Sequence, residues 1–164
     1  MLAYSRLFTL AKQRLYITNP YFIPNDTIMD ALKKAALSGV DVRLLLPAKS
    51  DSALVGAAAR FYFRDLLQTG VKIYLYKKGF VHAKTAVADG YASVVGTANM
   101  DIRSFDLNFE IMSLIYGNPF AGQMERAFFE DVTESDQIDL SDWLAQGRLK
   151  VLTYAIARLV SSFL

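Results

Sequence analysis

The sequence contains no cysteine and only one histidine, and these two shortages remove several classes of site. Without cysteine, the chain can form neither disulfides nor thiolate metal sites. A single histidine excludes a multi-histidine metal centre, and no tight group of carboxylates replaces it. We therefore expect no metal site.

The sequence also lacks a marked charge of either sign and any long apolar run. Its 18 basic residues nearly cancel its 16 acidic ones, which leaves a net charge of +2. This balance disfavours a nucleic-acid binder that depends on a broad basic face. No uninterrupted apolar run approaches the ~20 residues of a membrane span, and residues 1–6 lack the basic-then-apolar order of a signal peptide. Because the chain begins within a helical pattern, we expect it to be part of a larger protein.

Apolar residues are abundant. They make up 53% of the 164 residues, and aromatic residues make up 13%, so we expect an ordered single domain over residues 1–164. The mean hydropathy is positive. We interpret this excess as apolar surface that a partner covers.

The apolar pattern predicts alternating strands and helices. Helices are expected at residues 4–14, from Asn25 or Asp26 to residue 38, from Ser50 or Asp51 to residue 66, and at residues 118–128, with strands at 15–18, 40–46 and 71–76. Repeated strand–helix–strand units predict an α/β fold with a mixed, largely parallel β-sheet flanked by helices. Ligands bind beyond the strand ends or edges of such sheets.

The other segments are less regular. We expect strands at residues 81–88, 91–95 and 108–116, an irregular connector at 100–107, and a surface loop with a short turn at 130–142. The loop Tyr21-Phe22-Ile23-Pro24 is aromatic and stiffened by proline, and we expect it to contribute little to the core. Such a loop suits either a pocket wall or a hydrophobic staple onto the next helix.

The only histidine stands within the chain's densest group of chemically active residues. The group comprises His82-x-Lys84-x4-Asp89, Gly96-Thr97-x-Asn99, Arg103-Ser104 and Asn108-x-Glu110. In a strand at residues 81–88, His82 and Lys84 would share one face, and Gly96 would allow the backbone to come close beside His82. An imidazole, an ammonium, a hydroxyl and an amide in a small space suit a phosphate ester. The cation and the amide hold the oxygens while the imidazole attacks or carries a proton.

Taken one at a time, these residues have ordinary interpretations. A histidine in a strand is more often a packed or surface residue than a nucleophile, and Lys84 can be a solvated cation. Asn99 can cap a turn with Asp101, and Glu110 can be an exposed carboxylate. The intact spacing of the whole set favours a functional site.

This set resembles the signature of the phospholipase D superfamily, a His-Lys-Asp (HKD) motif followed by Gly-Ser/Thr-x-Asn. The fuller string, with TANMDIRSF and LNFE, is similar to the C-terminal half of bacterial cardiolipin synthases. The resemblance implies that His82 either forms a phosphohistidine or moves protons, and that Lys84 and Asn99 hold the phosphate. Thr97 stands where many relatives have serine and keeps the hydroxyl.

The resemblance also implies roles for two carboxylates. Glu110 would bond the far nitrogen of the histidine and fix its tautomer, which makes the imidazole a better nucleophile and proton carrier. Asp89 belongs to the motif and is included among the candidate catalytic residues. Asp89 is an odd number of residues from His82, so the two side chains would lie on opposite faces of a strand. This predicts a structural role for Asp89, through a bond to the backbone or to a neighbouring cation.

The implied reaction joins two phosphatidylglycerols into cardiolipin and releases glycerol, without a metal ion or organic cofactor. Two HKD motifs face one pocket in the family, so a second HKD half is expected in the same chain, in another chain, or through a homodimer. The implied location is the bacterial cytoplasmic membrane, peripheral through this domain and anchored by segments elsewhere. Alternatives are a homodimeric single-motif phosphodiesterase acting on nucleic acid or phospholipid, and a non-catalytic half that completes a partner.

The last pattern predicts a helix at residues 148–163 with an apolar stripe. The stripe comprises Leu149, Leu152, Ile156, Leu159 and Phe163, and the flanking cations are Arg148, Lys150 and Arg158. A basic amphipathic helix can lie in an anionic membrane surface, from which a lipid substrate would be drawn. Alternatively, the stripe packs on the sheet or on a second half, which the added breadth from Tyr154, Ala155 and Val160 favours.

Overall fold

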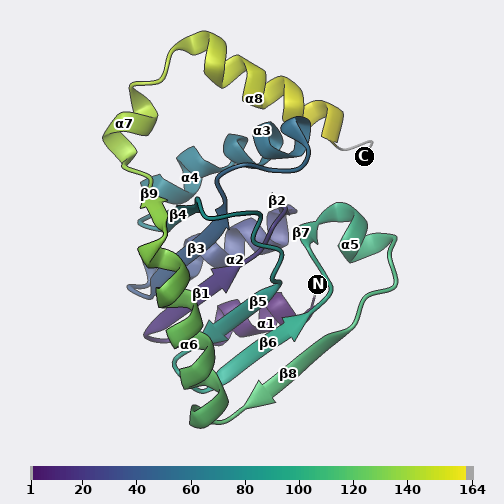
Figure 1. Ribbon diagram of the computed structural model, residues 1–164, viewed down its shortest axis with the longest axis vertical. Helices are drawn as coiled ribbons and strands as arrows, with labels where there is room; N and C mark the ends of the chain where they lie inside the picture. The colour runs from purple at the N-terminus through teal and green to yellow at the C-terminus, as the bar shows by residue number, and fades with distance from the viewer. Residues whose placement is uncertain (1, 162–164) are drawn as a thin grey trace.

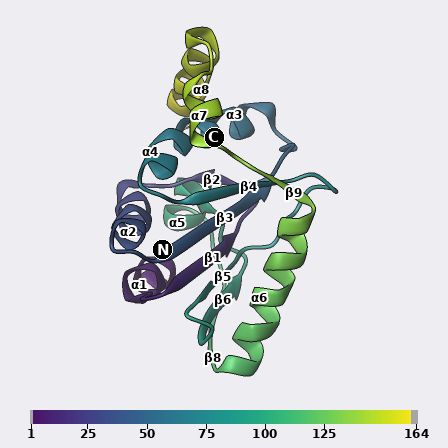
Figure 2. The same cartoon turned by 90° about the vertical axis from the view of Figure 1, so that its left-hand side faces the viewer.

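The chain folds around a central β-sheet with helices on both faces (Figure 1 and Figure 2). The computed structural model describes residues 2–161. Within this range the main sheet has seven strands, in the spatial order β8 (Met112–Tyr116), β6 (Ala92–Gly96), β5 (Thr85–Ala88), β1 (Arg14–Thr18), β3 (Asp41–Pro47), β4 (Lys72–Tyr76) and β9 (Ser135–Gln137). Strands β1, β3 and β4 pair in parallel at the centre, and the outer pairings are antiparallel. The predicted α/β fold, a mixed sheet flanked by helices, is confirmed.

Different helices cover the two faces of the sheet (Figure 2). On one face, α1 (Leu2–Leu10), α2 (Asp26–Leu37) and α4 (Phe63–Gln68) pack into the larger core cluster. On the other face, α6 (Asn118–Thr133) buries Ala121 and Phe128 in a smaller cluster. The central strands are buried on both faces, which explains their nearly continuous apolar sequences.

A third group of helices lies beyond the β4 side of the sheet (Figure 1). Helix α3 (Ala53–Phe61) packs against α8 (Arg148–Ser161), and α7 (Leu140–Leu144) precedes α8 in the chain. The buried residues of this contact are Ile23, Ala58 and Ala157. Among the described helices, none is long and apolar enough to cross a membrane.

Several local predictions are confirmed, with small shifts in the capping residues. The side chain of Asn25 accepts the backbone N–H of Ile28 at 3.1 Å and caps α2. Ser52, rather than Ser50 or Asp51, caps α3. The turns that follow α2 and α4 contain Gly39 and Gly70, which have φ values of 88° and 93°.

The first helix ends at Leu10 rather than at residue 14. The backbone N–H groups of Lys12, Gln13 and Arg14 donate to the carboxylate of Asp89 at 2.8 to 3.0 Å. These donors are therefore not available to continue the helical ladder. A side chain that is 75 to 77 residues away in sequence sets this boundary.

Three other predictions of segment type were wrong or incomplete. The single helix expected up to residue 66 is divided at Tyr62 into α3 and α4. The expected connector at 100–107 contains β7 (Met100–Asp101) and α5 (Ile102–Asp106), and β7 pairs with β2 (Phe22–Ile23). The expected loop at 130–142 contains the end of α6, strand β9 and the start of α7. The pairings of β2 with β7 and of β4 with β9 join distant segments, so no local pattern reveals them.

Candidate active site at one end of the sheet

Strand pairing brings together, at one end of the main sheet, the segments that carry most of the predicted site residues (Figure 1). Thr18 at the end of β1 pairs with Thr85 at the start of β5, which in turn pairs with Val95. The next residue, Gly96, pairs with Met112 at the start of β8. The segments after β1 and β6 and those before β5 and β8 therefore meet. They carry His82, Lys84, Thr97, Asn99 and Glu110.

The environments of His82 and Lys84 differ, although we predicted that they share one strand face. Strand β5 begins only at Thr85, so both residues lie in the extended segment before it. The His82 side chain is exposed, whereas Lys84 is only 8% exposed. The Lys84 ammonium donates to the carbonyl oxygen of His82 at 2.8 Å. Lysine and histidine are thus connected through the backbone.

Burial lowers the pKa of the Lys84 ammonium, and the carboxylates of Glu110 and Asp101 oppose this effect. A buried cation with weakened solvation binds an anion strongly, because the anion replaces lost hydration. The position of Lys84 at the end of the sheet therefore suits a phosphate group. A bound phosphate oxygen would compete with the His82 carbonyl oxygen for the ammonium.

Thr97 and Glu110 form a direct contact. The Thr97 hydroxyl bonds to the Glu110 carboxylate, and it accepts the backbone N–H of Ile111 at 3.0 Å. The amide of Asn108 donates to the same carboxylate at 3.4 Å. We predicted that Glu110 would bond His82, but its hydrogen-bond partners within residues 2–161 are Thr97 and Asn108.

Gly96 is required by a close backbone approach, although not the predicted one beside His82. A Cβ atom here would overlap the carbonyl oxygen of Ile111 and would lie 2.9 Å from Met112 Cα. The backbone N–H of Gly96 donates to the carbonyl oxygen of Lys84 at 3.1 Å. Gly96 therefore brings β8 and the Lys84 backbone to the same point.

Asn99 lines a pocket of about 630 Å³ between α3, α5 and the end of α8. Its side-chain oxygen is buried and has no hydrogen-bond partner among the described residues. The wall is part apolar and part polar, with Tyr21, Ile23, Asp51, Ser52, Val55, Asn99, Asp101, Ile102, Arg103, Leu107, Asn108 and Ser161. Such a mixture suits a ligand with both a polar group and hydrocarbon.

Two buried residues that we did not predict hold the backbone on either side of Asn99. The hydroxyl of Tyr4, from α1, donates to the carbonyl oxygen of Ala98 at 3.1 Å. The side-chain oxygen of Asn19, which is 0% exposed, accepts the backbone N–H of Met100 at 3.1 Å. It also accepts the N–H of Tyr21 at 3.3 Å. A polar Asn directly after a buried strand was the available sequence signal.

The aromatic loop contributes to the pocket, to the core and to the surroundings of His82. Tyr21 and Ile23 line the pocket, and Phe22 is completely buried, so the expectation that the loop adds little to the core was wrong. The Tyr21 ring lies edge-on to His82 at 6.1 Å, and the Phe80 ring lies 5.5 Å from His82.

Tyr21 also contacts a carboxylate that we did not predict. Its hydroxyl donates to Asp51 at 2.5 Å. Burial and this contact together raise the pKa of Tyr21 to about 12, and the hydroxyl holds the pKa of Asp51 below its usual value. The loop therefore connects the histidine ring to a polar part of the pocket wall.

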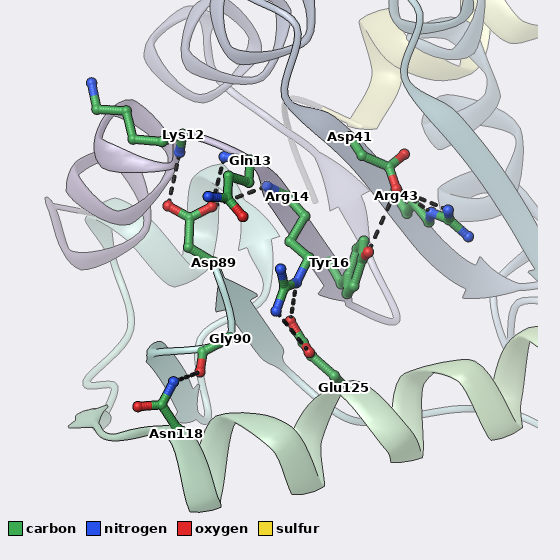
Figure 3. A network of polar contacts seen from close by, with 10 residues as sticks. All are labelled: Lys12, Gln13, Arg14, Tyr16, Asp41, Arg43, Asp89, Gly90, Asn118 and Glu125. Carbon is green, nitrogen blue, oxygen red and sulfur yellow. Dashed lines mark hydrogen bonds and ion pairs between the residues drawn. The ribbon is translucent and has the colours of Figure 1, made fainter.

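Asp89 follows the end of β5, whereas His82 precedes its start. Figure 3 shows the Asp89 carboxylate beside the backbone of Lys12, Gln13 and Arg14. That carboxylate receives the backbone N–H groups of residues 12–14, and the Asp89 φ of 54° is in the left-handed region. Nearby, Arg14 forms an ion pair with Glu125 at 2.6 Å. The geometry gives Asp89 a role in joining α1, β1 and β5. It does not bring Asp89 to the other five candidates.

Within residues 2–161, no group of three or more acidic, histidine or cysteine side chains is placed to hold a metal ion. What the sheet end offers is an exposed imidazole, a buried ammonium, an amide with an unpartnered oxygen and a hydroxyl–carboxylate pair. These groups can bind a phosphate ester and exchange protons with it without a metal ion.

Comparison with known sequences agrees with this chemistry. The family model described as "Cardiolipin synthase, PLD-like domain" matches residues 4–132. A protein named cardiolipin synthase from Clostridium perfringens (strain 13 / Type A) is 46% identical over 158 residues, which is 96% of this chain and 33% of the relative. A cardiolipin synthase from Listeria welshimeri is 44% identical over 161 residues, or 98% of this chain and 33% of the relative. The chain thus spans about a third of the length of these curated relatives.

Solved structures share the fold. Nuc from Salmonella typhimurium, described as a phospholipase D family member, superposes with a TM-score of 0.74 at 18% identity, covering 84% of this chain and 89% of that one. A phosphatidylserine synthase from Haemophilus influenzae superposes with a TM-score of 0.70 at 17% identity, covering 97% of this chain and 41% of that one. At these identities the similarity shows the fold alone.

Proposed function

Because the chain belongs to the PLD-like domain family of cardiolipin synthases, we propose that it is the C-terminal catalytic half of such an enzyme. The reaction transfers a phosphatidyl group from one phosphatidylglycerol to another and releases glycerol. A second HKD half, in the same chain, in another chain or in a second copy, supplies the other histidine. The full-length protein works at the bacterial cytoplasmic membrane, which this domain meets from the surface while other segments provide the anchor.

The transfer takes place in two displacements at phosphorus. In the first, one histidine attacks the phosphorus atom, a P–N bond forms, and the P–O bond to glycerol breaks as the second histidine protonates the departing oxygen. In the second, a hydroxyl group of another phosphatidylglycerol gives its proton to that second histidine and attacks phosphorus. The P–N bond then breaks and cardiolipin is complete. His82 takes one of these two roles.

The other site residues prepare this exchange. Lys84 and Asn99 hold the phosphate oxygens, where charge accumulates during each displacement. Thr97 and Glu110 form the polar pair at the start of β8, and Glu110 orients an imidazole in the complete site. The observation that carries the proposal is the convergence of these residues at one end of the sheet through strand pairing.

Substitution of His82 in the complete enzyme tests the proposal. His82→Ala should lower phosphatidyl transfer by several orders of magnitude, because no other residue of this chain can replace its imidazole. The His82 side chain is exposed, so circular dichroism and thermal unfolding should be unchanged. The exposed change Gln68→Ala, on α4, serves as the control. A folded His82→Ala enzyme that retains more than a few per cent of the activity would refute the assignment.

One observation favours a second candidate, a homodimeric single-motif phosphodiesterase. The chain covers 89% of Nuc, so a solved chain of similar size consists almost entirely of this fold. Hydrolysis of a simple phosphodiester by the purified chain, lost together with its dimer on dilution, would support this candidate. The net charge of +2 makes nucleic acid an unfavourable substrate for it.

A further inference from the structure

Helix α8 carries an apolar stripe that faces outward, which the sequence pattern alone did not decide. Leu149, Leu152, Ile156 and Leu159 are exposed by 81%, 54%, 52% and 62% of their surfaces. Phe163, the last predicted member, lies outside the described residues. The sequence left two alternatives, contact with an anionic membrane surface or packing on the sheet or a second half. Within residues 2–161, no part of the chain covers it.

A different face of α8 holds the helix to the domain. Tyr154, Ala157 and Ser161 are its buried residues, and Ala157 packs with Ala58 of α3. The ring of Tyr154 stacks on Trp143 of α7 at 5.8 Å. On a helix with 3.6 residues per turn, Leu152 and Leu159 point to the side opposite Ala157 and Ser161. The outward stripe is thus not needed for packing against α3.

The charges on α8 are all positive, and by the helical period Arg148 lies beside the stripe whereas Lys150 lies nearer the side of Ala157. Arg148, Lys150 and Arg158 are exposed, and α8 has no acidic residue between Arg148 and Ser161. The Arg158 guanidinium lies 5.3 Å above the ring of Phe61 on α3, which places it at the border between α8 and α3. A helix with apolar side chains and cations complements an anionic lipid surface. The apolar side chains insert into the bilayer, and the cations contact the anionic head groups.

The C-terminal end of α8 borders the candidate site. Ser161, at the C-terminal end of α8, lines the same pocket as Asn99. Across the pocket, Ile102 and Leu107 of the α5 region are exposed. Because Ser161 lies on the side of α8 opposite Leu152 and Leu159, the pocket and the stripe border different sides of the same helix.

The comparisons separate α7 and α8 from the common domain. The family model ends at residue 132, before α7 begins. The alignments with the cardiolipin synthases span 158 and 161 of the 164 residues and so include most of α8. The cardiolipin synthases therefore share this segment with the chain, although the family model does not cover it.

We propose that the outward face of α8 docks the domain onto an anionic phospholipid bilayer. The inference rests on the proposed function, because the lipid substrate of that reaction lies in such a bilayer. The docking itself requires neither the second HKD half nor turnover.

Binding of the full chain to vesicles tests the docking. The chain should sediment with phosphatidylglycerol-containing vesicles and not with pure phosphatidylcholine vesicles, and the binding should weaken as salt is raised. Leu152→Asp with Leu159→Asp should lower the partition coefficient at least tenfold, because two inserting side chains become anionic. The matched control is Leu37→Asp on α2, which replaces an equally exposed leucine and should change the partition coefficient less than twofold.

A second variant leaves the apolar stripe intact. Arg148→Gln with Lys150→Gln should remove most of the preference for anionic vesicles, while the contact of Tyr154 with Trp143 keeps the fluorescence of the only tryptophan unchanged. Deletion of α8 is a poorer test, because its other face packs on α3. Equal binding to both vesicle types, or unchanged binding by either double variant, would overturn the proposal.

Another occupant would give a different result. If a second copy covers the stripe, Leu152→Asp with Leu159→Asp will abolish a dimer in sedimentation velocity without lipid, and the proposal falls. Failure of docking and failure of the proposed reaction can be told apart. Transfer by the complete enzyme on detergent-solubilised lipid requires His82 and no bilayer, whereas vesicle binding requires α8 and no chemistry.

Discussion

At the scale of single residues, side chains outside the HKD motif hold the backbone of the candidate site in place. Tyr4 and Asn19 fix the backbone before and after Asn99, and neither has a place in the HKD pattern. Between these two fixed points, the Asn99 side-chain oxygen has no hydrogen-bond partner in the described chain. An unsatisfied buried acceptor is costly, and it is tolerated best where a ligand or water can satisfy it.

Asp89 shows how a motif residue can act far from the chemistry. Burial by itself would raise the pKa of its carboxyl group, but three backbone N–H donors and Arg14 outweigh that effect, so the pKa lies below the usual value. A lowered pKa means that the carboxylate stabilises the fold above the unfolded value of about 3.9. This stabilisation is lost as the pH falls through the lower pKa of the folded protein.

We therefore predict that Asp89→Asn lowers the free energy of unfolding by about 1 to 3 kcal/mol at pH 7, because one of the two accepting oxygens becomes a donor facing Lys12 N–H. Asparagine tolerates the left-handed backbone at this position, so the change isolates the carboxylate. Urea unfolding at pH 7 and at pH 3 measures the effect. The difference in free energy of unfolding between the wild-type protein and Asp89→Asn should be smaller at pH 3 than at pH 7. An equal difference at both pH values would rule out the carboxylate as its cause.

At the scale of elements, the contact between β6 and β8 positions the polar groups of the site. Gly96 at the end of β6 approaches the Ile111–Met112 backbone more closely than a residue with a Cβ atom could. The next residue, Thr97, donates its backbone N–H to the carbonyl oxygen of Ile111, accepts the Ile111 N–H at its hydroxyl, and contacts Glu110. The beginning of β8 is thus joined to the site where the backbone of Gly96 and Thr97 meets that of Ile111 and Met112.

Gly96→Ala should lower the free energy of unfolding by about 1 to 3 kcal/mol, because the added methyl group would overlap the carbonyl oxygen of Ile111 and Met112 Cα as well as the Met112 sulfur. The backbone amide NMR signals of residues 97 and 110–112 should shift as the two segments separate. Gly79→Ala is the control, since no atom lies within 4 Å of its added Cβ, and it should change stability by less than about 0.5 kcal/mol. If both variants are equally stable, the close approach is not a constraint.

At the scale of the whole molecule, the site lies beside apolar surface. Leu107, Phe109 and Ile111 are strongly exposed in the segment between α5 and β8, next to Glu110. The chain spans about a third of the cardiolipin synthases that it matches. A second HKD half would add the second histidine and could cover this surface at the same time.

The isolated chain should accordingly self-associate through this segment. Sedimentation velocity should show a rising fraction of dimer or larger species as the protein concentration rises. Phe109→Ser with Ile111→Ser should raise the dissociation constant of the dimer at least tenfold. Leu37→Ser, an exposed change on α2, should leave the association unchanged. A monomer at high concentration that is fully active would contradict the requirement for a second histidine.

The sequence by itself determined the family and most of the framework. Residue spacing identified the candidate set around His82, and apolar periodicity located most of the strands and helices within a few residues. These signals are local, because the caps, the helix-ending glycines and the alternation of buried residues act over a few positions. The predicted α/β fold needed no other information.

Only the tertiary structure decided the relations between distant segments. The end of α1 depends on Asp89, the identity of residues 100–101 as a strand depends on Phe22 and Ile23, and the close approach at Gly96 is to Ile111. The outward direction of the α8 stripe follows from the fit of Ala157 against α3, and the helical period alone leaves both faces possible. The physical reason is the same in each case: the deciding contact joins residues tens of positions apart, and a sequence pattern records only what each segment prefers locally.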